Sequence, residues 1–215
     1  MEAATFRGTD ATGGRTARDT AVQSPAAFTI ANPGPLGLAA FALTTFVLSM
    51  FNAGLVGSAG EPVVFGLALA YGGLAQLLAG MWEFRTGNTF GATAFTSYGA
   101  FWLSFWAFVQ FFEDKVPKAD AGHAVGLYLI AWGIFTTYMF VASLRTTAAI
   151  ALVFILLAAT FIILGIGNAD GHTGIVKLGG WVGLATALAA WYASFAEVTN
   201  ATFGRTVFPV RPLKR

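Results

Sequence analysis

Six long apolar stretches, separated by short polar segments, form the main pattern of this chain. They cover residues 36–56, 63–82, 90–112, 125–144, 147–166 and 174–196. Each has about 20 residues, the length that a helix rising about 1.5 Å per residue needs to cross the hydrocarbon core of a bilayer. Strands of a membrane barrel would be shorter and would alternate in polarity, which these stretches do not. The pattern predicts an all-α integral membrane protein, with six transmembrane helices in a compact bundle.

The composition supports this interpretation independently. Hydrophobic residues make up 56% of the chain and charged residues only 10%, against about 25% charged in an ordinary soluble domain. So few charged side chains could not cover the surface of a soluble protein of 215 residues. The absence of cysteine excludes a disulfide framework and a thiolate site.

The basic residues predict the orientation. With six spans both termini share one side, which carries nine of the twelve Lys and Arg residues, whereas the other side has only Lys115, Lys118 and Lys177. Cytoplasmic loops of membrane proteins carry the excess of Lys and Arg, so both termini are expected in the cytoplasm. Because these residues are scattered rather than gathered in a patch, no nucleic-acid partner is predicted.

Three regions follow from the same pattern. Residues 1–31 are polar and lack the apolar core of a signal peptide, so they are expected to form a disordered cytoplasmic tail. Residues 32–209 form the six-helix transmembrane domain. Residues 210–215 are expected to be a short cytoplasmic tail.

The first apolar stretch begins with Asn-Pro-Gly-Pro at residues 32–35. Proline lacks a backbone N–H and suits the first turn of a helix, so Asn32 is predicted to be the N-cap. Helical spacing then predicts one face that contains Phe41, Thr44, Thr45, Leu48 and Asn52. Hydroxyl groups on such a face either bond to a helix or line a path for a solute, and the sequence leaves both open.

Glu83 is the one carboxylate at the end of an apolar stretch in near-continuous helical register, and it shares a helix face with Gln76. An ionisable side chain costs about 3 kcal/mol or more at mid-membrane but much less near the interface. Two interpretations remain. Glu83 is either an interfacial residue paired with Arg85 or with a helix end, or a proton carrier at the cytoplasmic mouth.

No cofactor, metal site or enzymatic activity is predicted. His123 and His172 lie far apart, without a third ligand at a metal-like spacing. A retinal protein needs a lysine within a span, and the candidate, Lys177, lies near a span end. No nucleophile and base occur together in a pattern typical of a membrane enzyme.

Three segments together resemble one known family. They read NPGPLGLAAF at residues 32–41, EFRTGNTFGATAFTSYGAFW at 83–102 and FGRTVFP at 203–209. These segments are similar to motifs of the acetate uptake transporter family, which includes bacterial succinate-acetate permeases, and the resemblance covers residues 31–209. It implies a permease of the cell membrane, in contact with lipid, for acetate and related short carboxylates, with succinate as a further candidate. It also implies a homo-oligomer, a hexamer with a path through each subunit.

The resemblance implies roles for individual residues. A narrow constriction in these permeases matches Phe41 and Tyr98 by motif and Leu157 by counting back from the GIGN run. Positions that bind the carboxylate on either side of this constriction match Thr44, Thr45, Gln76, Asn88 and Trp102. Glu83 becomes the candidate for proton coupling. The chain departs from the first motif at Gly34, where Ala or Val is common.

Energetics favour proton coupling over passive flow. Moving one anion inward against about 100 mV costs about 2.3 kcal/mol, roughly a fifty-fold ratio of concentrations. A passive carboxylate channel would therefore lose acetate outward, whereas a proton that moves with the anion cancels its charge. A passive carboxylate channel and a pore for small neutral solutes or ammonium remain the alternatives.

Overall fold

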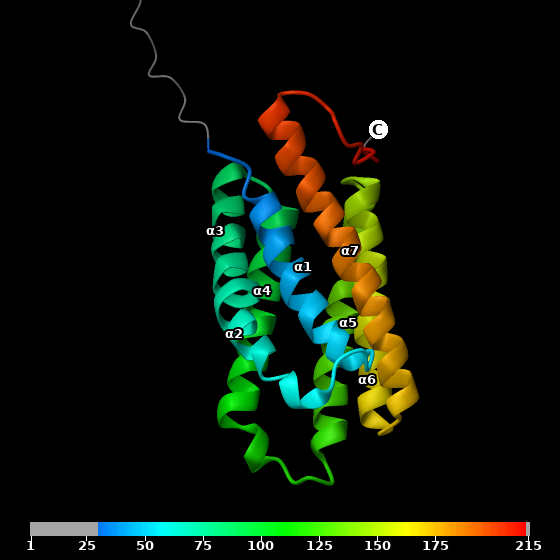
Figure 1. Cartoon of the computed structure of the whole chain (residues 1–215). Coiled ribbons are helices and arrows are strands. Elements are labelled where there is room, and N and C mark those ends of the chain that lie inside the picture. The colour runs from blue at the N-terminus through cyan, green and yellow to red at the C-terminus, as the bar shows by residue number, and fades with distance from the viewer. Residues whose placement is uncertain (1–29, 214–215) are drawn as a thin grey trace, which may run out of the picture.

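The computed structural model describes residues 30–213, so the predicted N-terminal tail lies almost wholly outside the described residues. Within this range the protein is helical, and its single β-bridge joins Thr147 to Pro212. The all-α prediction is confirmed. The helices, shown in Figure 1, are α1 (Gly34–Asn52), α2 (Val63–Leu69), α3 (Gln76–Thr86), α4 (Thr89–Phe111), α5 (Ala121–Ser143), α6 (Ala148–Ala169) and α7 (Thr173–Phe203).

Each predicted apolar stretch coincides with one long helix, because α2, the segment Ala70–Ala75 and α3 form one continuous helix. Five of the long helices are apolar enough to cross a membrane: α1, the continuous helix, α5, α6 and α7. Helix α4 has 23 residues, enough to span a bilayer. Its Thr, Ser, Tyr and Trp side chains, however, make it less apolar than the others.

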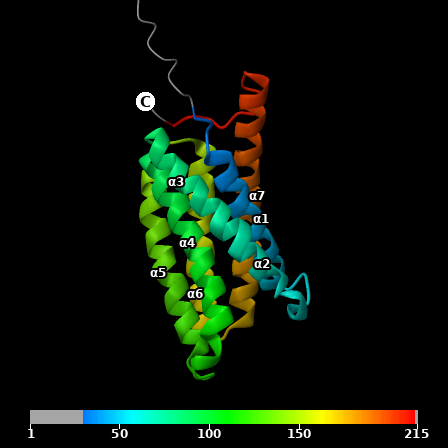
Figure 2. The same ribbon diagram turned by 90° about the vertical axis from the view of Figure 1, so that its left-hand side faces the viewer.

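The helices run roughly along one common direction, and both ends of the described chain lie at the same end of the bundle (Figure 1). Neighbouring helices pack in the order α5, α6, α7, α1, α3 and α4. Figure 2, turned by 90°, shows α1 between α3 and α7. This position gives α1 contact with both halves of the bundle.

Glycines bring neighbouring helix backbones into contact. A Cβ atom on Gly180 of α7 would collide with the backbone of Asn52 and Ala53 at the end of α1. One on Gly80 of α3 would collide with the backbone of Thr96 on α4. In lipid, where burial of apolar surface gives little drive for association, such close packing holds helices together.

The segment Ala70–Ala75 is π-helical. A Cβ atom on Gly72 in this turn would lie 2.7 Å from Oγ1 of Thr44 on α1, so only glycine leaves room here. Single π-helical turns within α-helices are frequently found at functional sites. The turn ends immediately before Gln76.

The start of α1 differs from the prediction by one residue. Pro33, not Asn32, occupies the N-cap position, and it has no side-chain cap. Asn32 nevertheless accepts a hydrogen bond from the Gly34 N–H at 2.9 Å. Its side chain therefore still satisfies one of the free donors at the beginning of the helix.

The C-terminal segment after α7 packs back onto the bundle. The carbonyl groups of Arg211 and Val210 accept hydrogen bonds from the N–H groups of Ala148 and Ala149, at 2.8 and 3.3 Å. This contact supplies acceptors for the free donors in the first turn of α6.

We expect Gly180→Ala to destabilise the protein, because the added methyl group must push α7 away from the end of α1. Overpacking of this kind costs about 1–3 kcal/mol. Thermal unfolding in detergent measures the effect. Gly66→Ala on α2 is the control, because a Cβ atom at Gly66 meets nothing within 4 Å. Equal melting temperatures for the two variants would contradict the packing argument.

Candidate functional site

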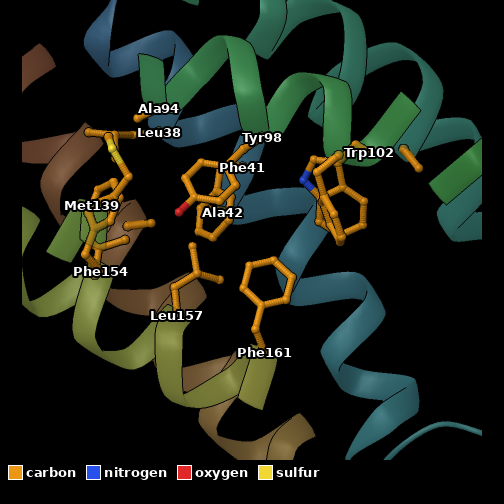
Figure 3. Packing of buried hydrophobic residues seen from close by; sticks show 14 of the residues in the cluster. Leu38, Phe41, Ala42, Ala94, Tyr98, Trp102, Met139, Phe154, Leu157 and Phe161 are labelled. Atoms are coloured by element: carbon orange, nitrogen blue, oxygen red, sulfur yellow. The ribbon is translucent and has the colours of Figure 1, made fainter. Parts of the chain in front are cut away.

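The three residues predicted to form a constriction come together in the centre of the bundle. Phe41 on α1, Tyr98 on α4 and Leu157 on α6 are 5%, 3% and 3% exposed. The ring centroids of Phe41 and Tyr98 are 6.0 Å apart, and Figure 3 shows Leu157 directed toward both rings. Three different helices thus contribute to one apolar layer.

The tyrosine hydroxyl has a defined partner. Thr136 on α5 donates its own hydroxyl hydrogen to the Trp132 carbonyl at 2.7 Å. The Tyr98 hydroxyl lies 2.9 Å from Thr136 Oγ1 and therefore donates to it. This bond fixes the ring across the bundle, between α4 and α5.

Further aromatic rings surround Tyr98. Its ring centroid lies 5.4 Å from that of Phe135, 6.0 Å from that of Phe154 and 6.5 Å from that of Phe161. Sequence reasoning missed these residues and Thr136. They lie within long apolar stretches, and no motif that the chain shares with the family marks them as different from lipid-facing side chains. We call Phe41, Tyr98, Leu157, Phe154 and Phe161 the central layer.

Three of the predicted carboxylate-binding residues have buried polar atoms with no hydrogen-bond partner among the described residues. These atoms are Thr45 Oγ1, Gln76 Oε1 and Trp102 Nε1. A buried polar group without a partner costs about 1–3 kcal/mol, which a bound solute or water would offset. Trp102 lies one helical turn from Tyr98 on α4 (Figure 3).

The other two predicted residues already have partners. Thr44 is fully buried and donates to the Ala40 carbonyl at 2.9 Å. Asn88 is exposed, and its side chain accepts from the Gly91 N–H at 3.1 Å as the N-cap of α4. It lies at the start of α4, far from the central layer.

Glu83 is 2% exposed and is held by neutral donors. Its Oε2 accepts from Asn88 Nδ2 at 2.9 Å and from Thr86 Oγ1 at 3.1 Å. Arg85 is exposed. The structure thus places Asn88 as a residue that positions the Glu83 carboxylate.

A second carboxylate lies close to Glu83. Glu197 on α7 accepts from Asn32 Nδ2 at 3.1 Å. A Cβ atom on Gly34 would lie 3.3 Å from Glu197 Oε2 and 3.4 Å from Glu83 Oε1, so Gly34 separates the two carboxylates. We call Glu83, Asn88, Asn32 and Glu197 the carboxylate cluster. Sequence reasoning did not place Glu197 in the site, because its proximity to Glu83 arises only from the packing of α7 and α3 against α1.

A cavity of about 710 Å³ lies on the other side of the central layer, at the end of the bundle opposite the described chain ends. Its walls come from α1, α2, α4, α5 and α6 and from the segments that precede α2 and follow α4. Phe101, Leu129 and Leu164 line its apolar part, and Asn52 lines it as well. We call this cavity the vestibule.

These features define a class: a multi-pass helical membrane protein in which an apolar layer separates a vestibule from the carboxylate cluster around the buried Glu83. Residues 14–215 match the model of the GPR1/FUN34/yaaH family. The chain belongs to that family.

The names of two relatives describe transport of acetate. The chain covers most of the length of one and about two thirds of the length of the other. The chain is 41% identical to the succinate-acetate/proton symporter SatP of Escherichia coli, over 84% of this chain and 95% of the relative. It is 43% identical to acetate permease A of Emericella nidulans, over 84% of this chain and 65% of the relative. Its fold matches a solved structure of the bacterial acetate channel SatP with a TM-score of 0.79 and 41% identity, covering 85% of this chain and 99% of that chain.

The name of a third relative describes transport of a different solute. Ammonia transport outward protein 2 of Saccharomyces cerevisiae is 46% identical over 79% of this chain. The chain spans 62% of the length of this protein and of another yeast relative.

We expect Asn88→Ala to lower the free energy of unfolding by about 1 to 3 kcal/mol, because it removes the cap of α4 and a donor to the buried Glu83 carboxylate. Thermal unfolding in detergent measures the loss. Thr89→Ala, at the exposed neighbouring position, is the control and should cost little. If both variants lost the same free energy of unfolding, the hydrogen bonds of Asn88 would not stabilise the protein.

Proposed function

We propose that this protein transports acetate and related short carboxylates, with succinate as a further substrate, across the plasma membrane, and that it couples this transport to protons. The observation that carries the proposal is the central layer between the vestibule and the carboxylate cluster. The names of the relatives support the substrate class.

The central layer suits a molecule with one methyl group and one polar end. Phe41, Tyr98 and Leu157 present apolar surface to the methyl group. Thr45 and Trp102 have hydroxyl and indole N–H donors that find no partner within residues 30–213, and such donors fit a carboxylate oxygen. The layer is closed in this structure, so side-chain movement must accompany each passage.

Glu83 is the proposed proton carrier. It lies beyond the central layer from the vestibule, and both of its side-chain hydrogen bonds come from neutral groups. A carboxylate in this position can take a proton and release it at the end of the path. Moving the proton with the anion removes the cost of moving charge against the membrane potential.

The orientation belongs to the same proposal. Both described chain ends lie at one end of the bundle, and among the described residues Arg85, Arg145, Arg205 and Arg211 lie at that end, whereas Lys115, Lys118 and Lys177 lie at the other. The positive-inside rule then places six transmembrane spans with both termini in the cytoplasm. The vestibule opens to the outside and the carboxylate cluster lies toward the cytoplasm.

The proposed assembly is a homo-oligomer surrounded by lipid, a hexamer by resemblance to the family. Large apolar side chains remain exposed on the flanks of most helices, among them Leu127, Ile134 and Val141 on α5. Exposed apolar surface on a membrane helix faces lipid or another subunit.

Two alternatives have support of their own. A passive carboxylate channel is favoured by the solved structure, which is described as an acetate channel. A pore for ammonia is favoured by the name of the yeast relative. In neither alternative does a proton carried by Glu83 drive the accumulation of substrate.

Uptake of radiolabelled acetate into vesicles that contain the purified protein tests the function. We expect accumulation with an inward proton gradient and none above equilibration without it. Glu83→Gln keeps the shape of the side chain and removes its charge, so it should abolish accumulation while acetate counterflow persists. Counterflow in the same vesicles is the control for folding. Accumulation by Glu83→Gln equal to that of the parent would exclude Glu83 as the proton carrier, and no acetate uptake by the parent would exclude the function.

We expect Phe41→Ala and Leu157→Ala to admit bulkier acids such as lactate, because each leaves a void in the central layer. The ratio of lactate to acetate uptake should rise in both variants. Phe46→Ala is the matched control, since Phe46 lies on α1 but packs against Trp191, with ring centroids 5.0 Å apart. An unchanged ratio in both layer variants would mean that the constriction lies elsewhere.

A further inference from the structure

The vestibule is lined by charges of one sign. Glu61, in the segment before α2, and Glu113, after α4, both line it, and no Lys, Arg or His is among its lining residues. A cavity lined by one sign of charge concentrates ions of the opposite sign and repels ions of its own sign. When both glutamates are charged, the cavity therefore repels a carboxylate anion.

The basic groups at this end of the bundle lie outside the lining. Lys115 Nζ lies over the ring of Phe112, 4.9 Å from its centroid. The Lys177 side chain on α7 lies beside Gly54, where a Cβ atom would be 3.0 Å from its Cε. Of the other charged or titratable groups nearby, Tyr128 lines the vestibule, whereas Asp114, Lys118, Asp120, His123, Asp170 and His172 do not.

The Glu61 carboxyl responds to acid. Burial raises the pKa of the Glu61 carboxyl above its usual value, and the negative charge of Glu113 raises this pKa further. As the external pH falls, Glu61 therefore takes up its proton at a higher pH than a free glutamate would. As the pH rises through that range, its negative charge returns.

The vestibule leads directly to the central layer. Phe101 at its inner end has its ring centroid 5.1 Å from that of Phe161, which stacks against Tyr98. A solute must therefore pass the field of the two glutamates before it reaches the constriction.

We propose that Glu61, assisted by Glu113, is a specificity-determining residue of the outer vestibule: when charged it excludes the carboxylate anion, and when neutral it admits the substrate. The inference rests on the proposed function and deepens it. It places a second acid-sensing step at the outer end of the path, separate from Glu83. Substrate then arrives as the undissociated acid, or as an anion accompanied by a proton.

Initial rates of acetate uptake into cells or oriented vesicles, measured from mildly acidic to neutral external pH, test this inference in the full-length protein. We expect Glu61→Gln to raise uptake at neutral pH by about three-fold or more and to leave uptake at acidic pH nearly unchanged. Glu113→Gln should act in the same direction but less strongly, because it removes only the assisting charge. Asp114→Asn is the matched control, an adjacent acid that does not line the vestibule.

Ionic strength supplies a second measurement. Salt screens partly exposed charges, so raising the ionic strength should increase the neutral-pH uptake of the parent, and should increase that of Glu61→Gln, which keeps only Glu113, by a smaller factor. Identical pH and salt profiles for the parent, Glu61→Gln and Glu113→Gln would overturn the inference while acetate transport by the parent still stands. A parent that moves no acetate at any pH would instead remove the proposed function, and this inference with it.

Discussion

Contact between helix backbones at glycines is the constraint on which the rest of this structure depends. Lipid tails are as apolar as the side chains, so burial of apolar surface does little to hold membrane helices together. Gly180 brings α7 against α1, Gly80 brings α3 against α4, and Gly126 brings α5 within contact of the Gly165 carbonyl on α6. These approaches leave α1, α4 and α6 close enough for Phe41, Tyr98 and Leu157 to meet.

The central layer then divides the polar groups of the bundle into two sets. Glu61 and Glu113 lie in the vestibule, and Glu83 and Glu197 lie in the carboxylate cluster beyond the layer. Aromatic rings of the central layer fill the space between the two sets. In the proposed transport of carboxylates, an apolar layer without hydrogen-bonding groups would be a high barrier, and the donors of Thr45 and Trp102, which have no partner among the described residues, would offset part of it.

The sequence predicted the helices well because a bilayer demands apolar stretches of a narrow range of length. It failed at the π-helical turn, Ala70–Ala75, since no local pattern distinguishes this turn from an ordinary α-helix. It also placed the start of α1 one residue early, because both Asn32 and Pro33 are compatible with the N-cap.

The site was predictable only in part. Motifs located Phe41 and Tyr98, and the structure brings them together with Leu157. Thr136, which accepts the tyrosine hydrogen bond, has no such motif and lies in an apolar stretch. The pairs Glu83 with Glu197 and Glu61 with Glu113 join residues far apart in the chain, so only the packing of the helices reveals them.

The central claim is that the layer around Tyr98 separates solvent on the two sides of the bundle. The chain has no cysteine, so single cysteines report access without background. Leu48 lines the vestibule, whereas Leu38 is buried on α1 on the other side of Phe41. A membrane-impermeant thiol reagent added outside intact cells should label L48C rapidly and L38C very slowly, and Phe41→Ala should accelerate labelling of L38C. Equally rapid labelling of L38C and L48C with Phe41 in place would contradict the account.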